Sequence, residues 1–150
     1  MGVRGGRGAN LLQGEVVTLA PLAARTTGDN GVAVDLCGER RRIIVVNAIT
    51  ASASDAGDTL DVYVDWSIDN VTWYNAIHFT QQAGNGAART EFAMLDPANP
   101  GAAVVNVTTD AAAGVVRPAL IGRYIRARWA IVDSGDGDQS HTFSVVCYAE

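Results

Sequence analysis

The chain has 150 residues, the length of one ordinary domain, and its apolar fraction of 48% fits a soluble globular protein rather than a disordered one. Its net charge of −5 and pI near 4.9 disfavour a general role in binding nucleic acid. No apolar stretch is long enough to cross a membrane, and no apolar run follows Arg4 and Arg7 that would make a secretory signal. Without such a signal, Cys37 and Cys147 are expected to be reduced thiols.

The first thirty residues differ from the rest of the chain. Residues 1–10 are rich in Gly and Arg and have no periodicity, residues 13–19 predict one short strand, and residues 20–30 carry the turn signals of a loop. We therefore divide the chain into an N-terminal arm with a short strand, residues 1–30, and a β-sandwich domain, residues 31–150.

From residue 31 onward the dominant signal is a period of two. The clearest case is 60–68, in which five apolar residues alternate with Asp61, Tyr63, Asp65 and Ser67. The turn at 69–70 and the run 72–80 complete a hairpin. Further strands are expected at 32–37, 43–50, 89–95, 103–108, 120–132 and 141–149. Turns rich in Gly, Asp, Asn and Pro separate them. The sequence thus predicts an all-β fold, an antiparallel sandwich or jelly roll of about 8–9 strands.

The residues needed for catalysis are missing. The chain has two histidines, His78 and His141, and no strained nucleophile motif, so we expect no enzyme and no cofactor. Each histidine is interpreted as a surface or interface side chain.

The turn that carries Asp133, Asp136 and Asp138 suggests calcium, because oxygen-rich loops bind hard cations. Its spacing does not match an EF-hand loop, and Gly with Asp also suits a tight turn. We therefore predict a turn without a metal and keep calcium as the alternative. Asp55 and Asp58 would add ligands if the two loops lie together.

Asp61, Asp65 and Asp69 share a spacing that could supply the paired carboxylates of a glycosidase, although Asp61 and Asp65 fall on the polar face of an ordinary strand. We favour cross-strand ion pairs with Arg126 and Arg128 on an exposed face, worth about 0.2–1 kcal/mol each.

Trp66 and Trp129 alternate with core positions and are expected in the core. Trp73 and Tyr74 point to opposite faces, so one of them is expected at the surface, where Tyr63 and Tyr124 would join it as a weak binding surface.

The run from Asp61 to Asn75, followed by Phe79-Thr80-Gln81 and later by the strands at 124–129 and 142–145, resembles small structural proteins of tailed bacteriophages. The resemblance covers roughly the last ninety residues. It implies a capsid decoration or stabilising protein: a small β domain, often trimeric, that binds the major capsid protein or other virion proteins without a cofactor. Such a homo-oligomer would be located on the virion, assembled in the host cytoplasm, and would contact neither nucleic acid nor membrane.

On this hypothesis, partner binding falls to the N-terminal arm and to a basic edge. The residues are Arg4, Arg7, Asn10, Leu11 and Leu12 in the arm, and Arg40, Arg41 and Arg42 at the edge. One alternative is a carbohydrate- or receptor-binding module of a phage tail or bacterial surface, using exposed aromatics and the calcium loops. A second is a neck or tail structural component.

Overall fold

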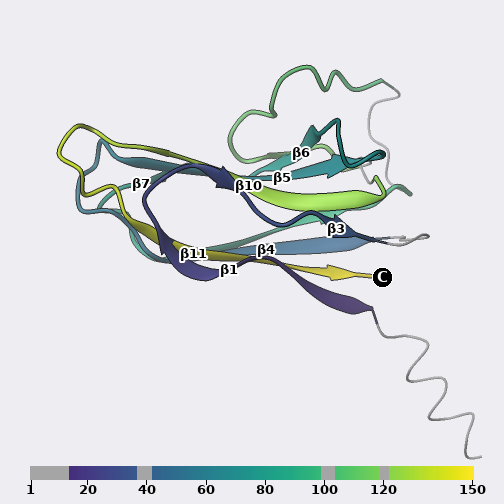
Figure 1. The fold of residues 1–150 in the computed structure, drawn as a ribbon, viewed down its shortest axis with the longest axis horizontal. Coiled ribbons are helices and arrows are strands. Elements are labelled where there is room, and N and C mark those ends of the chain that lie inside the picture. Colours follow the sequence, from purple (N-terminus) through teal and green to yellow (C-terminus); the bar gives the residue numbers. More distant parts are fainter. Residues whose placement is uncertain (1–13, 37–41, 99–103, 119–121) are drawn as a thin grey trace, which may run out of the picture.

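The computed structural model describes residues 14–36, 42–98, 104–118 and 122–150, and within these ranges the chain is all β (Figure 1). The described residues form eleven strands, of which seven have five residues or more and four have two residues. Their bounds are β1 Glu15–Arg25, β2 Asp29–Asn30, β3 Val34–Asp35, β4 Ile43–Ala51, β5 Thr59–Ser67, β6 Tyr74–His78, β7 Gln82–Ala83, β8 Arg89–Leu95, β9 Val115–Val116, β10 Tyr124–Val132 and β11 His141–Ala149. No helix in the described ranges is long and apolar enough to span a membrane.

The strands form two antiparallel sheets, which confirms the predicted sandwich. Sheet A has the order β1-β11-β4-β8, and sheet B has the order β2-β10-β5-β6-β9, with β3 also paired to β10 and β7 to β5. Because β4 and β11 belong to sheet A while β5 and β10 belong to sheet B, the connections 52–58 and 133–140 both cross between the sheets.

One apolar core lies between the sheets. Its inward side chains come from alternate positions of the long strands, such as Val145 and Cys147 of β11 and Val62 and Val64 of β5, all buried. Phe143 is completely buried and meets Trp129 edge-on, with ring centroids 5.6 Å apart. Burying a side chain of this size contributes about 1.5–3 kcal/mol, so the core accounts for the pairing of the two sheets.

The N-terminal strand is longer than predicted. β1 continues past residue 19 to Arg25, which pairs with His141 of β11, although 20–30 was expected to be a loop. The register shifts between Thr18 and Ala20 and again between Ala20 and Ala23, so Pro21 falls in an irregular stretch. An edge strand tolerates proline and bulges because its outer side has no neighbour to pair with. The expected arm segment, residues 1–13, lies outside the described residues.

Two other predicted strands are wrong in extent. Among the described residues, 32–36 contribute only β3, and 104–108 contain no strand. Val32 is 77% exposed and Val104 is 88% exposed, whereas Leu36 is buried in the core and Val34 packs against it.

The outer face of sheet B is covered by the chain itself. The segment 104–118 passes over β5, β6 and β10, and Figure 1 shows it as the green loop on the side away from sheet A. As a result β5 is buried along almost its whole length on both faces. Asp61, Tyr63 and Asp65 were expected on an exposed face, and this expectation is wrong because the covering segment was not recognised.

Beneath this segment the predicted cross-strand pairs form for Asp65 in a buried setting, whereas Asp61 lies against His78 instead of an arginine. Asp65 lies opposite Arg126 in the register, and its carboxylate is 2.8 Å from Nε of Arg128 and 3.6 Å from Nη2 of Arg126. Arg128 also reaches Asp110 of the covering segment at 2.7 Å, and Asn75 donates to Asp65 at 3.2 Å. The ion pairs therefore attach residues 104–118 to the sheet as well as aligning β5 with β10.

Prediction for the buried ion pairs. Replacement of Asp65 by Ala leaves Arg126 and Arg128 without their shared carboxylate under the covering segment, and removing one partner of a buried pair costs about 3–5 kcal/mol. Asp35, which pairs with the exposed Arg123 at 2.9 Å, is the matched control, and its replacement by Ala should cost about 0–1 kcal/mol. Urea unfolding of the two variants measures both values, and equal losses would contradict a buried network.

Candidate functional site

Two features outside the core are candidates for function. The first is a set of aspartates on the two loops that cross between the sheets, here called the acidic loop cluster: Asp55, Asp58, Asp133, Asp136 and Asp138. The second is the outer face of sheet A.

The loop 133–140 owes its shape to glycine and to one aspartate. Gly135 and Gly137 have φ values of +125° and +83°, a backbone region that favours glycine. Oδ1 of Asp133 accepts hydrogen bonds from the amides of Gly135 at 2.8 Å and Gly137 at 3.3 Å. In place of the predicted tight turn, residues 133–140 form a connection that crosses between the sheets, and it places three carboxylates within six residues.

The loop 52–58 is fixed against its neighbours by backbone hydrogen bonds. The amide of Gly84 donates to the carbonyl of Asp58 at 2.6 Å, and that of Asn85 donates to Ala53 at 2.5 Å. Across the sandwich end, the amide of Ser134 donates to Oδ1 of Asp58 at 2.6 Å. This last bond joins the two crossing loops, and it is the largest cause holding the pKa of Asp58 below its ordinary value.

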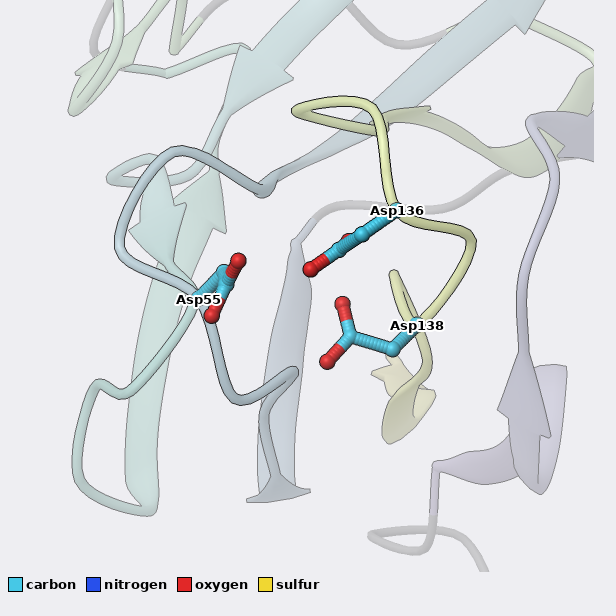
Figure 2. A group of neighbouring side chains, drawn as sticks. All are labelled: Asp55, Asp136 and Asp138. Carbon is cyan, nitrogen blue, oxygen red and sulfur yellow. The ribbon is translucent and has the colours of Figure 1, made fainter.

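The five carboxylates come together as the sequence analysis anticipated for clustered loops. Oxygens of Asp55, Asp136 and Asp138 all lie within 4.8 Å of one another, and so do oxygens of Asp58, Asp133 and Asp136. Figure 2 shows Asp136 and Asp138 pointing from one loop toward Asp55 on the other. The pKa of Asp138 is raised, mainly by a side-chain hydrogen bond with Asp136 and further by the negative charge of that neighbour.

His141 begins β11 directly after this loop and is completely buried, so its assignment as a surface or interface side chain is wrong. Neither ring nitrogen has a hydrogen-bond partner among the described residues. Burial lowers the pKa of His141 from its ordinary value of 6.5, and the charge of Asp58 opposes that shift.

His78 is also buried rather than at the surface. Its Nε2 lies 2.7 Å from Oδ1 of Asp61, and its Nδ1 lies 2.7 Å from the carbonyl oxygen of Ala111 in the covering segment. Both ring nitrogens are therefore within hydrogen-bond distance of an oxygen atom of a neighbouring residue. With both nitrogens engaged, His78 links the covering segment to β5 and has no nitrogen directed at a nucleophile.

A hollow beside His78 is small. It has a volume of about 90 Å³ and is lined by Phe79, Glu91, Phe92 and neighbouring residues of β6, β8 and β9. Pockets for small organic ligands usually have about 300–1,000 Å³, so this hollow does not fit one.

The outer face of sheet A is apolar across all four of its strands. The pairing places Val16, Tyr148, Ile44 and Met94 in one row, and Thr18, Val146, Val46 and Phe92 in the next. Phe92 is 75% exposed and Val16 is 70% exposed, while the central residues are half-buried by their neighbours. We call the seven residues other than Thr18 the apolar outer face. A third row of Ser144, Ala48 and Thr90 also lacks charge.

This face was missed by the sequence analysis, although it left a signal. The strands 43–50 and 141–149 are apolar on both alternating faces, whereas a sandwich strand with one solvated face alternates apolar with polar.

The residues expected to bind partners are mostly outside the described ranges. These are Arg4, Arg7, Asn10, Leu11, Leu12, Arg40 and Arg41. Arg42 is described: it is exposed, and its guanidinium pairs with Glu150 next to the backbone hydrogen bonds that join residues 42 and 150. Cys37 is likewise outside the described ranges, and Cys147 is buried in the core.

The expected aromatic platform forms only in part. Tyr63 is buried under Arg128, whose guanidinium lies 3.9 Å from the ring centroid, and its place on an exposed surface is therefore a wrong prediction. Trp73 is half-buried with Arg126 over its ring, and Tyr74 stacks on Trp66 with centroids 5.1 Å apart.

Comparison with known proteins finds no family model and no curated protein that matches the chain.

Prediction for His141. A buried histidine with a lowered pKa stays neutral while the unfolded chain takes up a proton, so the free energy of unfolding should fall as pH drops through about 6.5. Replacement of His141 by Leu removes this titration and should flatten the dependence between about pH 7.5 and 5.5. Urea unfolding of both proteins at each pH measures the difference in slope, and an unchanged slope would exclude His141 as its source.

Proposed function

We propose that this chain is a non-catalytic virion structural protein, a capsid decoration or stabilising protein that works as a homo-oligomer. The observation that carries the proposal is the apolar outer face, seven apolar side chains on four adjacent strands with no charged residue in its three rows. Monomeric proteins rarely expose contiguous apolar surface, and such a surface usually marks a site of contact with another molecule. The resemblance of the β5–β6 hairpin region to small phage structural proteins supplies the setting.

We assign the apolar outer face to a second copy of this chain. Its three rows carry no charge, so two copies of a chain with net charge −5 can approach there without placing like charges opposite each other. A flat face that packs on its own copy is self-complementary, as a two-fold contact requires. Contacts with capsid subunits are then left to residues 1–13 and to the basic edge at 40–42, and many copies on one lattice bind tightly even when each contact is weak.

Prediction for oligomer formation. Replacement of Phe92 by Asp places a charge within the apolar outer face and should weaken self-association at least tenfold, measured by analytical ultracentrifugation over a concentration series. Val71 is as exposed as Phe92, at 79% against 75%, but lies in the β5–β6 turn, so Val71→Asp is the matched control and should associate like the wild type. Equal behaviour of the two variants, with unchanged thermal unfolding, would remove the second copy from this face.

Prediction for the virion. The chain should be present in stoichiometric, symmetry-related copies on purified particles of its virus, and deletion of residues 2–12 should lower its occupancy severalfold because the arm contacts are lost. Quantitative mass spectrometry of purified particles measures the copy number. Absence from particles would contradict the decoration role, and unchanged occupancy after the deletion would contradict the role of the arm.

The carbohydrate- or receptor-binding module stays as the second candidate, because the acidic loop cluster brings together the carboxylates that a calcium-assisted binding loop uses. A glycan array run with and without calcium separates the two functions: calcium-dependent glycan binding favours the module, and its absence favours the decoration protein.

A further inference from the structure

We propose that the acidic loop cluster binds one divalent cation of the calcium type. The site would lie at the end of the sandwich where the connections 52–58 and 133–140 cross between the sheets. This inference does not rest on the decoration function, since it concerns side chains that the apolar outer face does not include.

The spacing of the carboxylates matches the size of the ion. Calcium lies about 2.3–2.6 Å from its oxygen ligands, so two oxygens on one ion can be no more than about 5 Å apart. Both triplets of the cluster fall within that limit, at 4.8 Å or less, and Asp136 belongs to both. The two triplets therefore form one continuous group of oxygens rather than two separate ones.

A second observation, independent of the clustering, is the state of Asp58. Its side chain is completely buried, with 0% exposure, and Oδ1 accepts a hydrogen bond from the amide of Ser134 at 2.6 Å. Oδ2 receives no hydrogen bond from the described residues. A carboxylate oxygen buried without a partner is costly, and one oxygen of Asp58 lies within 4.8 Å of oxygens of Asp133 and Asp136. A cation in the cluster supplies the missing partner.

The charge distribution of the chain supports the same conclusion. The sequence has sixteen acidic and eleven basic residues, so removing these five aspartates from the count leaves eleven of each. The whole formal net charge of −5 is thus accounted for by this one cluster. None of the ion pairs among the described residues involves any of the five, so no arginine there neutralises them.

The ligand chemistry favours calcium over other ions. All five side chains offer carboxylate oxygens, which hard cations prefer, and thiolate or imidazole ligands of the zinc type are absent from the cluster. Magnesium demands a near-ideal octahedron of short bonds, whereas calcium accepts six to eight oxygens in irregular arrangements such as two loops provide. The ion would hold both crossing loops, and with them both sheets, at one end of the sandwich.

The test measures calcium binding directly on the full chain. Isothermal titration with calcium chloride should give one site, and the melting temperature in calcium at a hundredfold excess over Kd should exceed that in EGTA by about 5 °C or more. Magnesium chloride at the same concentration should give a much smaller shift. No shift in calcium, or an equal shift in magnesium, would overturn the proposal.

Two variants separate ligation from folding. Asp136 is exposed and shared by both triplets, so Asp136→Asn should weaken calcium binding at least tenfold while melting in EGTA at or above the wild-type temperature, because repulsion is relieved. Asp29, an exposed aspartate in β2 outside the cluster, is the matched control, and Asp29→Asn should bind like the wild type. If Asp136→Asn keeps the full calcium shift, Asp136 is not a ligand and the site is excluded. If the variant is less stable than the wild type in EGTA, Asp136 has a structural role, which also contradicts the site.

Discussion

The contact between Asp58 and Ser134 decides how the ends of the two sheets are joined. It is a hydrogen bond of 2.6 Å from a backbone amide to a carboxylate that is wholly removed from solvent. The two residues belong to the two connections that cross between the sheets, so this bond fixes the relative position of β4–β5 and β10–β11. A charged acceptor buried at this point forms a stronger hydrogen bond than a neutral one, but it also carries an uncompensated charge into the protein.

The outer faces of the two sheets differ in composition and in what covers them. Sheet B is covered by residues 104–118, and the underlying side chains are polar and paired: Asp65 with two arginines, and Asp61 with His78. Sheet A has an apolar outer face that no described segment covers, and its edge residue Phe92 is 75% exposed. Polar groups under a chain segment need specific partners, whereas an apolar face can be buried by any complementary surface. The polar outer face of sheet B therefore suits the attachment of a segment of the same chain, and the apolar outer face of sheet A suits association between molecules.

The sequence predicted the strands whose alternation is strong and missed features that depend on distant segments. The runs 43–50, 89–95 and 141–149 appear as strands with nearly the predicted bounds because their β-branched and apolar residues have one consistent conformation to adopt. The burial of Asp61 and Asp65 could not be read from β5, because it is caused by residues some fifty positions away that contain almost no regular structure. The continuation of β1 through Pro21 likewise depends on β11, which pairs with it from the other end of the chain.

The same limit applies to the candidate sites, and it explains why one was anticipated and the other was not. The acidic loop cluster was predicted on the condition that its two loops lie together. The acidic residues near 55–58 and 133–138 are recognisable from composition, and only the proximity of the two loops was unknown. Its proximity follows from topology: both loops connect the same two sheets at the same end, and in Figure 1 they lie opposite the C-terminus. The apolar outer face lies toward that other end, since Ile44 is near the start of β4 and Tyr148 near the end of β11. The excess negative charge of the chain thus lies at one end of the sandwich, and the apolar outer face lies toward the opposite end. Two copies can therefore associate through that face while their excess charge remains in water.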